Sequence, residues 1–248
     1  MQLRARQIEF YASLDAEDEI ERPRHYPRTV RFLLEEKLRR ALALLQPVAS
    51  ADALCVCGGS GMDAEWLARL GIRPTVLDLS PHALARTRVR ARRRGFETAL
   101  VRGDAARLPF SDQSFGLTLV HDGLHHLADP YRALDEMARV ARHELVVMEP
   151  AHAALTRLAV ALGLAADVEP AGNVVRRLNA RHVRARIRAA GWRRVRSARD
   201  LVYYQRWTFP IYRLANRDSI FTVVVLAYRL LNLAVGRWGN SLKVVARR

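Results

Sequence analysis

The stretch that decides the fold is LCVCGGSGMD, residues 54–63, followed by VLD at residues 76–78. It predicts an apolar strand, a glycine-rich turn, a helix and a second strand that ends in an acid. Glycine reaches backbone conformations closed to other residues, so Gly59-Ser60-Gly61 lets a ligand approach the main chain closely. Asp78 lies 17 residues after Gly61, near the usual spacing for a carboxylate that binds ribose hydroxyls. Together these features predict a nucleoside-containing cofactor at the carboxyl ends of a parallel sheet.

The length and composition indicate one globular domain. The chain has 248 residues, of which 50% are hydrophobic, enough to bury one large core. Its two cysteines, Cys55 and Cys57, fall in the first strand, where side chains two apart share a face and form no easy disulfide. Residues 1–21 contain no apolar signal-peptide core. We therefore expect a reducing, cytoplasmic location.

The charge of the chain is strongly positive. It carries 41 basic and 25 acidic side chains, a formal net charge of +16. Such a field favours anionic partners such as nucleic acid, anionic lipid or phosphorylated metabolites. Two arginine runs, at residues 86–94 and 176–188, are spread around more than one helix face. We expect each run to be a solvated outer face rather than a stripe that reads nucleic acid.

Strands and helices alternate along most of the chain, which predicts a parallel sheet with helices on both faces. The expected strands are 53–57, 74–79, 98–102, 115–121, 144–148, 192–204 and 241–247. The expected helices are 28–45, 62–70, 81–94, 130–142, 152–166 and 180–190. Residues 1–48 form an N-terminal helical arm or lid, and residues 49–248 form the main domain, with insertions on the substrate side at about 151–180 and 205–238.

Residues 220–235 are strongly apolar. The segment has 16 residues with Arg229 inside it, which predicts a helix too short and too interrupted to span a bilayer. We expect a buried cap helix. The alternative is a helix that lies in a membrane interface, with arginines drawn to anionic lipid, so that the protein is membrane-peripheral.

Three further motifs extend the pattern: RGDAARLPF at 102–110, SF at 114–115 and HDGLHHL at 121–127. With the glycine-rich turn, they resemble the class I S-adenosylmethionine-dependent methyltransferases, particularly the ubiquinone/menaquinone-biosynthesis group. The resemblance covers roughly residues 50–150. It implies an α/β fold: a Rossmann-like, seven-stranded, mostly parallel sheet with an antiparallel last strand. To this we add the N-terminal helical arm and a C-terminal helical insertion.

The resemblance also implies how S-adenosylmethionine is held. Asp78 accepts both ribose hydroxyls, Leu79 lies against the adenine, and Asp104 accepts from the adenine amino group. His121 lies close to the methionine part or the transferred methyl. The full predicted cofactor set is Cys57, Gly58, Gly59, Ser60, Gly61, Asp63, Asp78, Leu79, Asp104, Ala105 and His121.

The chain departs from the family pattern in the first strand. Cys55 stands where the family usually has an acid, and Cys57 where it has glycine. The missing acid normally helps to hold the methionine amino group, and Asp63 is our candidate for that task. Asp63 also argues against a dinucleotide oxidoreductase, because it would repel a pyrophosphate at the start of the helix. Asp104 has no assigned task in that alternative.

Methyl transfer needs a general base only if the acceptor must lose a proton. The candidates are His121, His125 and His126. Neighbouring histidines cannot face the same way, so we expect at most one of His125 and His126 in the pocket. The histidines and cysteines lack zinc-ligand spacing, so we predict no metal site.

The acceptor is expected to meet the parts that differ from the core fold. The predicted substrate residues are Tyr11, Tyr26, Asn173, Arg176 and Trp207. Trp207 belongs to an aromatic cluster suited to a flat or lipid-like molecule, and core packing is the alternative use of that cluster. We predict a methyltransferase for a small quinone-, polyketide- or lipid-like acceptor. The alternatives are an RNA or other nucleic-acid methyltransferase, a non-catalytic cofactor-binding module and an NAD(P)-dependent oxidoreductase.

Overall fold

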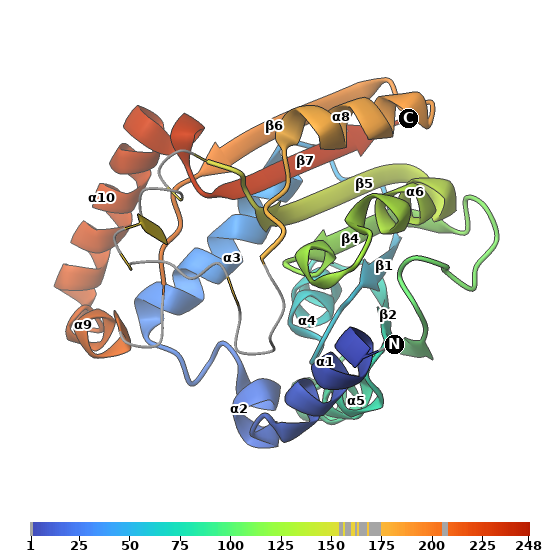
Figure 1. Cartoon of the computed structure of the whole chain (residues 1–248). Coiled ribbons are helices and arrows are strands. Elements are labelled where there is room, and N and C mark those ends of the chain that lie inside the picture. The colour runs from blue at the N-terminus through green and yellow to red at the C-terminus, as the bar shows by residue number, and fades with distance from the viewer. Residues whose placement is uncertain are drawn as a thin grey trace.

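The computed structural model describes residues 2–153, 156, 160–161, 163, 168, 175–204 and 208–248, without the side chains of residues 2–7. Its centre is a seven-stranded sheet in the order β3-β2-β1-β4-β5-β7-β6 (Figure 1). Only β7 runs antiparallel to its neighbours, β5 and β6. The strands are β1 (Asp52–Val56), β2 (Arg73–Asp78), β3 (Ala99–Arg102), β4 (Phe115–His121), β5 (Ala141–Pro150), β6 (Arg194–Asp200) and β7 (Ser241–Arg247).

Helices cover both faces of the sheet. On one face lie α3 (Arg28–Ala43), α4 (Met62–Arg69) and α5 (Pro81–Arg94), and on the other α6 (Pro130–Val140) and α8 (Ala180–Ala189). Successive strand residues point to opposite faces. Ala53 and Cys55 therefore pack under the first group, whereas Leu54 and Val56 pack under the second. Both sides of β1 are buried, which explains its unbroken apolar sequence.

The predicted fold is confirmed, with strand ends that differ by a few residues. Local signals fix the helix ends well: the Ser80 hydroxyl caps α5 at the Ala83 amide, and Gly95 ends it at φ +66°. The expected shared face of the two cysteines is wrong. β1 ends at Val56, and Cys57 turns to φ +53°, so its side chain packs on the opposite side of the sheet from Cys55. The predicted helix at 152–166 lies largely outside the described residues.

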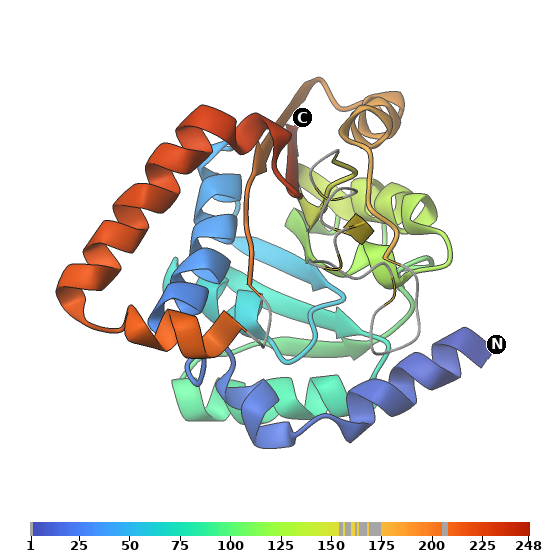
Figure 2. The ribbon, with the colours of Figure 1, turned by 60° about the vertical axis from the view of Figure 1, so that its left-hand side comes forward.

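The N-terminal helices α1 (Gln2–Ser13) and α2 (Ala16–Glu21) lie along α5 (Figure 2). Two α5 arginines hold them. Arg86 donates to the carbonyl oxygens of Tyr11 and Leu14, each at 2.7 Å, and Arg90 donates to that of Glu19 at 2.7 Å. Both arginines are buried. The expected solvated face is therefore wrong for Arg86 and Arg90, which are covered by the segment before α3, called the arm from here on. The arginines of the run that are exposed are Arg88, Arg92 and Arg93.

The C-terminal insertion contains α9 (Phe209–Leu214) and α10 (Asp218–Val235) and runs along the flank of α3 (Figure 2). The expected burial of α10 is wrong, since Asn232 is the one buried residue of this helix. The segment Asp218–Trp238, 21 residues, is long and apolar enough to span a membrane by length and composition, which overturns the expectation that it is too short. Two short 3₁₀ turns complete the described elements: η1 (Leu124–His126) and η3 (Gly236–Trp238).

Candidate cofactor and active site

A cavity of about 1120 Å³ opens at the carboxyl ends of the parallel strands. The sheet order reverses between β1 and β4, and open α/β sheets bind ligands at such a switch point. The residues that follow β1, β2, β3 and β4 all line this cavity. The arm, α3, the start of α9 and the segment after β6 supply further walls. The fold therefore gathers the predicted cofactor residues around one space.

The loop after β1 forms the floor of the cavity. Gly59 has φ +56°, and a Cβ atom built there meets no protein atom within 4 Å, so the main chain faces open space. The Thr87 hydroxyl donates to the Gly59 carbonyl oxygen at 2.8 Å and fixes the loop. Gly61 differs: it does not line the cavity, and a Cβ there would lie 2.7 Å from Cγ2 of Thr87. Gly61 thus serves the close packing of α4 on α5.

Asp78 ends β2 beside this loop. Its Oδ2 accepts from the Gly59 amide at 2.9 Å and its Oδ1 from the Ser80 amide at 2.8 Å. Burial raises the pKa of Asp78 above 3.8, although these backbone hydrogen bonds oppose the rise. Burial disfavours the ionised carboxylate, and additional hydrogen-bond donors stabilise it. Two ribose hydroxyls would provide such donors. The position predicted from the spacing is therefore chemically suited to its role.

Asp104 follows β3 on the neighbouring side of the cavity. Its Oδ1 accepts from the Ala106 amide at 2.9 Å, which orders the turn after the strand. Leu79, Asp104 and Ala105 all line the cavity. The turn role and the ligand role of Asp104 are compatible, because a carboxylate has several acceptor positions.

His121, at the end of β4, forms a pair with Asp63 on α4. Nδ1 of His121 lies 2.8 Å from Oδ1 of Asp63. A carboxylate only accepts, so Nδ1 carries a proton; in the neutral ring, Nε2 is then the acceptor. Nε2 is buried and has no hydrogen-bond partner. It lies 3.6 Å from Oδ2 of Asp122. The conjectured task of Asp63 at the cofactor amino group thus competes with a hydrogen bond to His121.

Sequence reasoning missed a buried ion pair in this cavity. Nζ of Lys37, on α3, donates to both carboxylate oxygens of Asp122 at 2.5 and 2.6 Å. Burial opposes ionisation of both groups, but Lys37 outweighs it and holds the pKa of Asp122 well below 3.8. Asp122 in turn raises the pKa of Lys37. Lys37 and Lys243 are the only lysines of an arginine-rich chain, a signal that could have marked Lys37.

Arg22 and Tyr204 line the cavity near this pair. Arg22 was also missed, whereas Tyr204 belongs to the aromatic cluster that we expected to line an acceptor pocket. Burial and the Asp122 carboxylate raise the pKa of Tyr204, so its hydroxyl stays protonated. With Lys37, these side chains make one end of the cavity rich in hydrogen-bond donors. They come from the arm, from α3 and from the segment after β6, which lie far apart in sequence.

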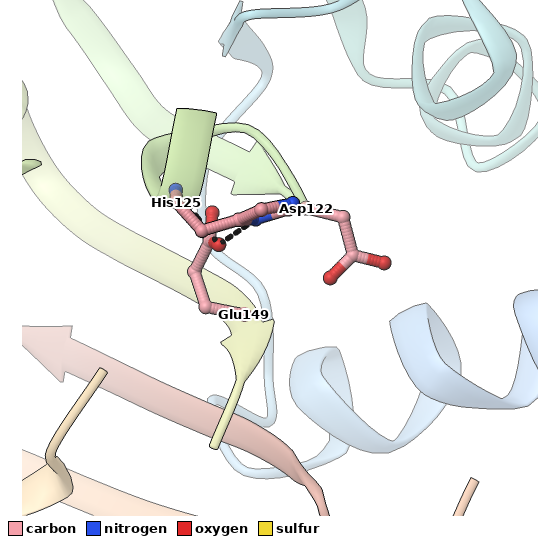
Figure 3. Close-up of side chains that lie close together, drawn as sticks. All are labelled: Asp122, His125 and Glu149. Atoms are coloured by element: carbon pink, nitrogen blue, oxygen red, sulfur yellow. Dashed lines mark hydrogen bonds and ion pairs between the residues drawn. The ribbon is translucent and has the colours of Figure 1, made fainter. Parts of the chain in front are cut away.

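His125 and Glu149 are linked to the backbone of the β4–α6 loop. Nδ1 of His125 lies 2.7 Å from Oε2 of Glu149, while Oε1 accepts from the Gly123 and Leu124 amides at 2.8 and 2.7 Å. Figure 3 shows the Asp122 carboxylate directed away from these two side chains. Although the three residues lie close enough to hold a metal ion, their acceptors are committed to Lys37 and to amides. The arrangement favours a rigid loop, and the absence of a metal remains a prediction.

The predicted acceptor residues are placed unevenly. The Tyr11 hydroxyl lies 3.2 Å from Nε2 of His126, and Tyr26 packs on Phe209 with ring centroids 4.9 Å apart; all four residues line the cavity. Arg176 is exposed and does not line it, because the chain turns tightly there and the Arg177 amide donates to the Val175 carbonyl oxygen. Asn173 and Trp207 lie outside the described residues. Contrary to expectation, both His125 and His126 reach the cavity.

The residues present fit S-adenosylmethionine. The open floor at Gly59 leaves room for a ligand against the main chain, and Asp78 offers acceptors next to it. No phosphate-binding group is needed, and Asp63 at the first turn of α4 would oppose one. The cavity continues past His121 to the donor-rich end, which leaves space for a second molecule.

Comparison with known proteins gives one matching family model and similar folds. Residues 54–147 match the methyltransferase domain family. In fold, the chain is similar to YcgJ of Bacillus subtilis, with a TM-score of 0.62 and 16% identity over 86% of this chain and 98% of that one. By sequence, residues 54–147 are therefore similar to methyltransferase domains, and the chain shares the fold of YcgJ.

The curated relatives are more particular. The chain is 38% identical over 107 residues to demethylmenaquinone methyltransferase of Renibacterium salmoninarum, covering 42% of this chain and 44% of the relative. It is 37% identical over 111 residues to the ubiquinone/menaquinone biosynthesis C-methyltransferase of Roseobacter denitrificans, covering 42% and 44%. The matches thus span less than half the length of these relatives.

Proposed function

We propose that this protein is an S-adenosylmethionine-dependent methyltransferase that acts on a small, ring-containing acceptor with an ionisable hydroxyl, such as a quinol. The observation that carries the proposal is the Asp78 carboxylate bonded to the Gly59 amide at 2.9 Å, beside an open backbone floor. When bound, S-adenosylmethionine supplies an electrophilic methyl group and leaves as a neutral thioether. The curated relatives support the acceptor class through their matched segments.

The chain's own residues then have three tasks. Asp78, Leu79 and Asp104 hold and orient the adenosyl end. Asp63 accepts the proton of His121 Nδ1 in a hydrogen bond, which leaves Nε2 as the candidate base. Lys37, Arg22 and Tyr204 surround the acceptor end with donors that stabilise a developing oxyanion.

The nucleic-acid alternative loses much of its motivation in this arrangement. Four of the α5 arginines that suggested it, Arg86, Arg90, Arg93 and Arg94, bind the backbone or the acids of the arm. We therefore favour the small-molecule acceptor, with RNA as a comparison substrate in the assay.

Calorimetry with S-adenosylhomocysteine tests the cofactor site. We expect binding by the natural chain and loss of about a hundredfold or more in affinity for Asp78→Ala, because two charge-assisted hydrogen bonds disappear. Thermal unfolding in the absence of ligand checks that the variant folds. Equal affinity of the two proteins would remove the basis of the proposal.

A transfer assay tests the acceptor. Protein, S-adenosylmethionine with a labelled methyl group, and either a reduced naphthoquinone or bulk RNA are incubated in parallel. We expect label in the organic extract of the quinol reaction and none in RNA. The reverse pattern would favour the nucleic-acid methyltransferase, and cofactor binding without label in either would leave a binding module.

A further inference from the structure

The outer face of helix α10 is mostly apolar. Six large apolar side chains point to solvent, and we call them the apolar flank: Ile220, Val223, Leu226, Leu230, Leu231 and Leu233. Leu233 is 81% exposed and Val223 65%. Surface helices of soluble proteins carry polar residues on the side that faces water. A contiguous apolar surface of this kind marks an interaction site.

The inner face of α10 is fastened to the domain. Phe32 of α3 meets Phe221 and Tyr228 edge-on, with ring centroids 6.0 and 5.4 Å apart. Further along, Oδ1 of Asn232 accepts from the Leu201 amide at 2.7 Å. The helix is therefore seated along its length, and the apolar flank is the surface it offers to a partner. A helix held in this way is suited to lie along a membrane rather than to cross it.

Charges around the apolar flank select the partner. Arg213 and Arg217 precede the helix, Arg229 lies at its edge and Arg237 follows it, and no acid pairs with any of them among the described residues. The one acid of α10, Asp218, is paired with Arg28. The guanidinium of Arg237 lies 3.9 Å from the centroid of the exposed Trp238 ring, a combination that suits the lipid headgroup region.

A second copy of the chain is a poorer partner. Two apolar flanks packed face to face would bring eight arginines together without acids to balance them. An anionic lipid surface satisfies both features, because acyl chains accept the leucines and phosphates accept the arginines.

We propose that the apolar flank and its surrounding arginines form a membrane-docking surface, which binds anionic lipid and holds the protein at the membrane interface. The short helix α9 continues this surface with the exposed Ile211 and Leu214, while its Phe209 lines the cavity. The docking surface thus adjoins one wall of the cavity. The proposal does not depend on methyl transfer.

Vesicle flotation of the full chain tests the proposal. Vesicles of phosphatidylcholine alone are compared with vesicles that contain about one-third phosphatidylglycerol. We expect the protein to float with the anionic vesicles and to stay soluble with the neutral ones. The paired substitution Leu226→Glu and Leu230→Glu should reduce binding at least tenfold. The matched control is Leu70→Glu, since Leu70 is 62% exposed and lies at the end of α4. This variant should bind the vesicles as the natural chain does. S-adenosylhomocysteine affinity and circular dichroism verify that every variant is folded.

The arginines are tested separately. Arg217→Gln with Arg237→Gln should weaken binding to anionic vesicles by about tenfold or more and make it less sensitive to salt. Three outcomes would overturn the proposal: a protein that never floats, binding that survives the two glutamates, or resistance to alkaline carbonate, which would indicate a spanning helix. A dimer in solution that the two glutamates dissolve would instead assign the surface to a second copy.

Discussion

At the scale of single residues, the site depends on which group carries which proton. Asp63→Asn tests the pair with His121, because an asparagine amide can donate to Nδ1 and move the proton to Nε2. We expect kcat to fall by about a hundredfold or more, because Nε2 then carries a proton and accepts none from the acceptor. S-adenosylhomocysteine affinity, measured alongside, separates this effect from lost cofactor binding. An unchanged kcat would mean that His121 is not the base.

Lys37 is the second residue whose charge matters. Lys37→Met leaves the Asp122 carboxylate without its partner, and we expect a loss of about 2 kcal/mol in the free energy of unfolding at neutral pH. This expected loss is smaller than for a fully buried ion pair, because the Asp122 side chain is 32% exposed. The double variant with Asp122→Asn should recover part of the loss. Urea unfolding of the four proteins measures this, and additive losses would contradict the coupling.

The same pair predicts a pH dependence. The pKa of Asp122 in the folded state lies below its unfolded value of 3.8. Its contribution to the free energy of unfolding is therefore complete above pH 3.8 and is lost as pH falls through the folded pKa. Lys37→Met removes the main cause of the lowered Asp122 pKa. The stability of the natural chain should therefore decline more steeply below about pH 4 than that of the variant.

At the scale of elements, Gly59 in the turn between β1 and α4 serves two purposes: its backbone conformation and the approach of a ligand to the main chain. Gly71, which follows α4, shares only the backbone conformation and is therefore the control. Gly59 and Gly71 have similar backbone angles, φ +56° and +77°, and a Cβ at either meets no protein atom within 4 Å. Gly59→Ala and Gly71→Ala should each cost about 1 kcal/mol of stability. Only Gly59 lines the cavity, so only Gly59→Ala should weaken S-adenosylhomocysteine binding. Calorimetry compares them, and equal affinities would show that the ligand does not approach this backbone.

The elements also show what the sequence can predict. β1 to β5 and the residues that follow them were predictable, because strand, turn and cap signals are local and the parallel topology brings strand ends together. Lys37 and Arg22 were not, because tertiary packing brings their distant segments to the cavity. The exposure of α10 was missed because hydropathy alone does not distinguish a core helix from one that faces lipid. The arginines of α5 were misjudged because a charge pattern does not reveal what covers it.

At the scale of the whole molecule, the arm and the insertion close the cavity from two sides, so ligand access depends on how firmly each is docked. The arm is held by charge-assisted hydrogen bonds to its backbone rather than by a large apolar interface: Arg86 alone donates to the carbonyl oxygens of Tyr11 and Leu14. Outer ion pairs such as Arg93 with Glu17 are exposed and contribute less. The buried arginine should therefore control the arm.

Arg86→Ala tests this control against Arg88→Ala, a neighbour on the same helix that is exposed. Loss of the two hydrogen bonds of Arg86 should let the arm open more often, and amide hydrogen exchange across residues 2–21 should rise about tenfold or more. Arg88→Ala should leave it unchanged. Because Tyr11 reaches His126 inside the cavity, an opened arm also exposes the reaction space to water. If amide hydrogen exchange in the arm is equally slow in both variants, docking of the arm depends on the outer ion pairs. Added salt should then release it.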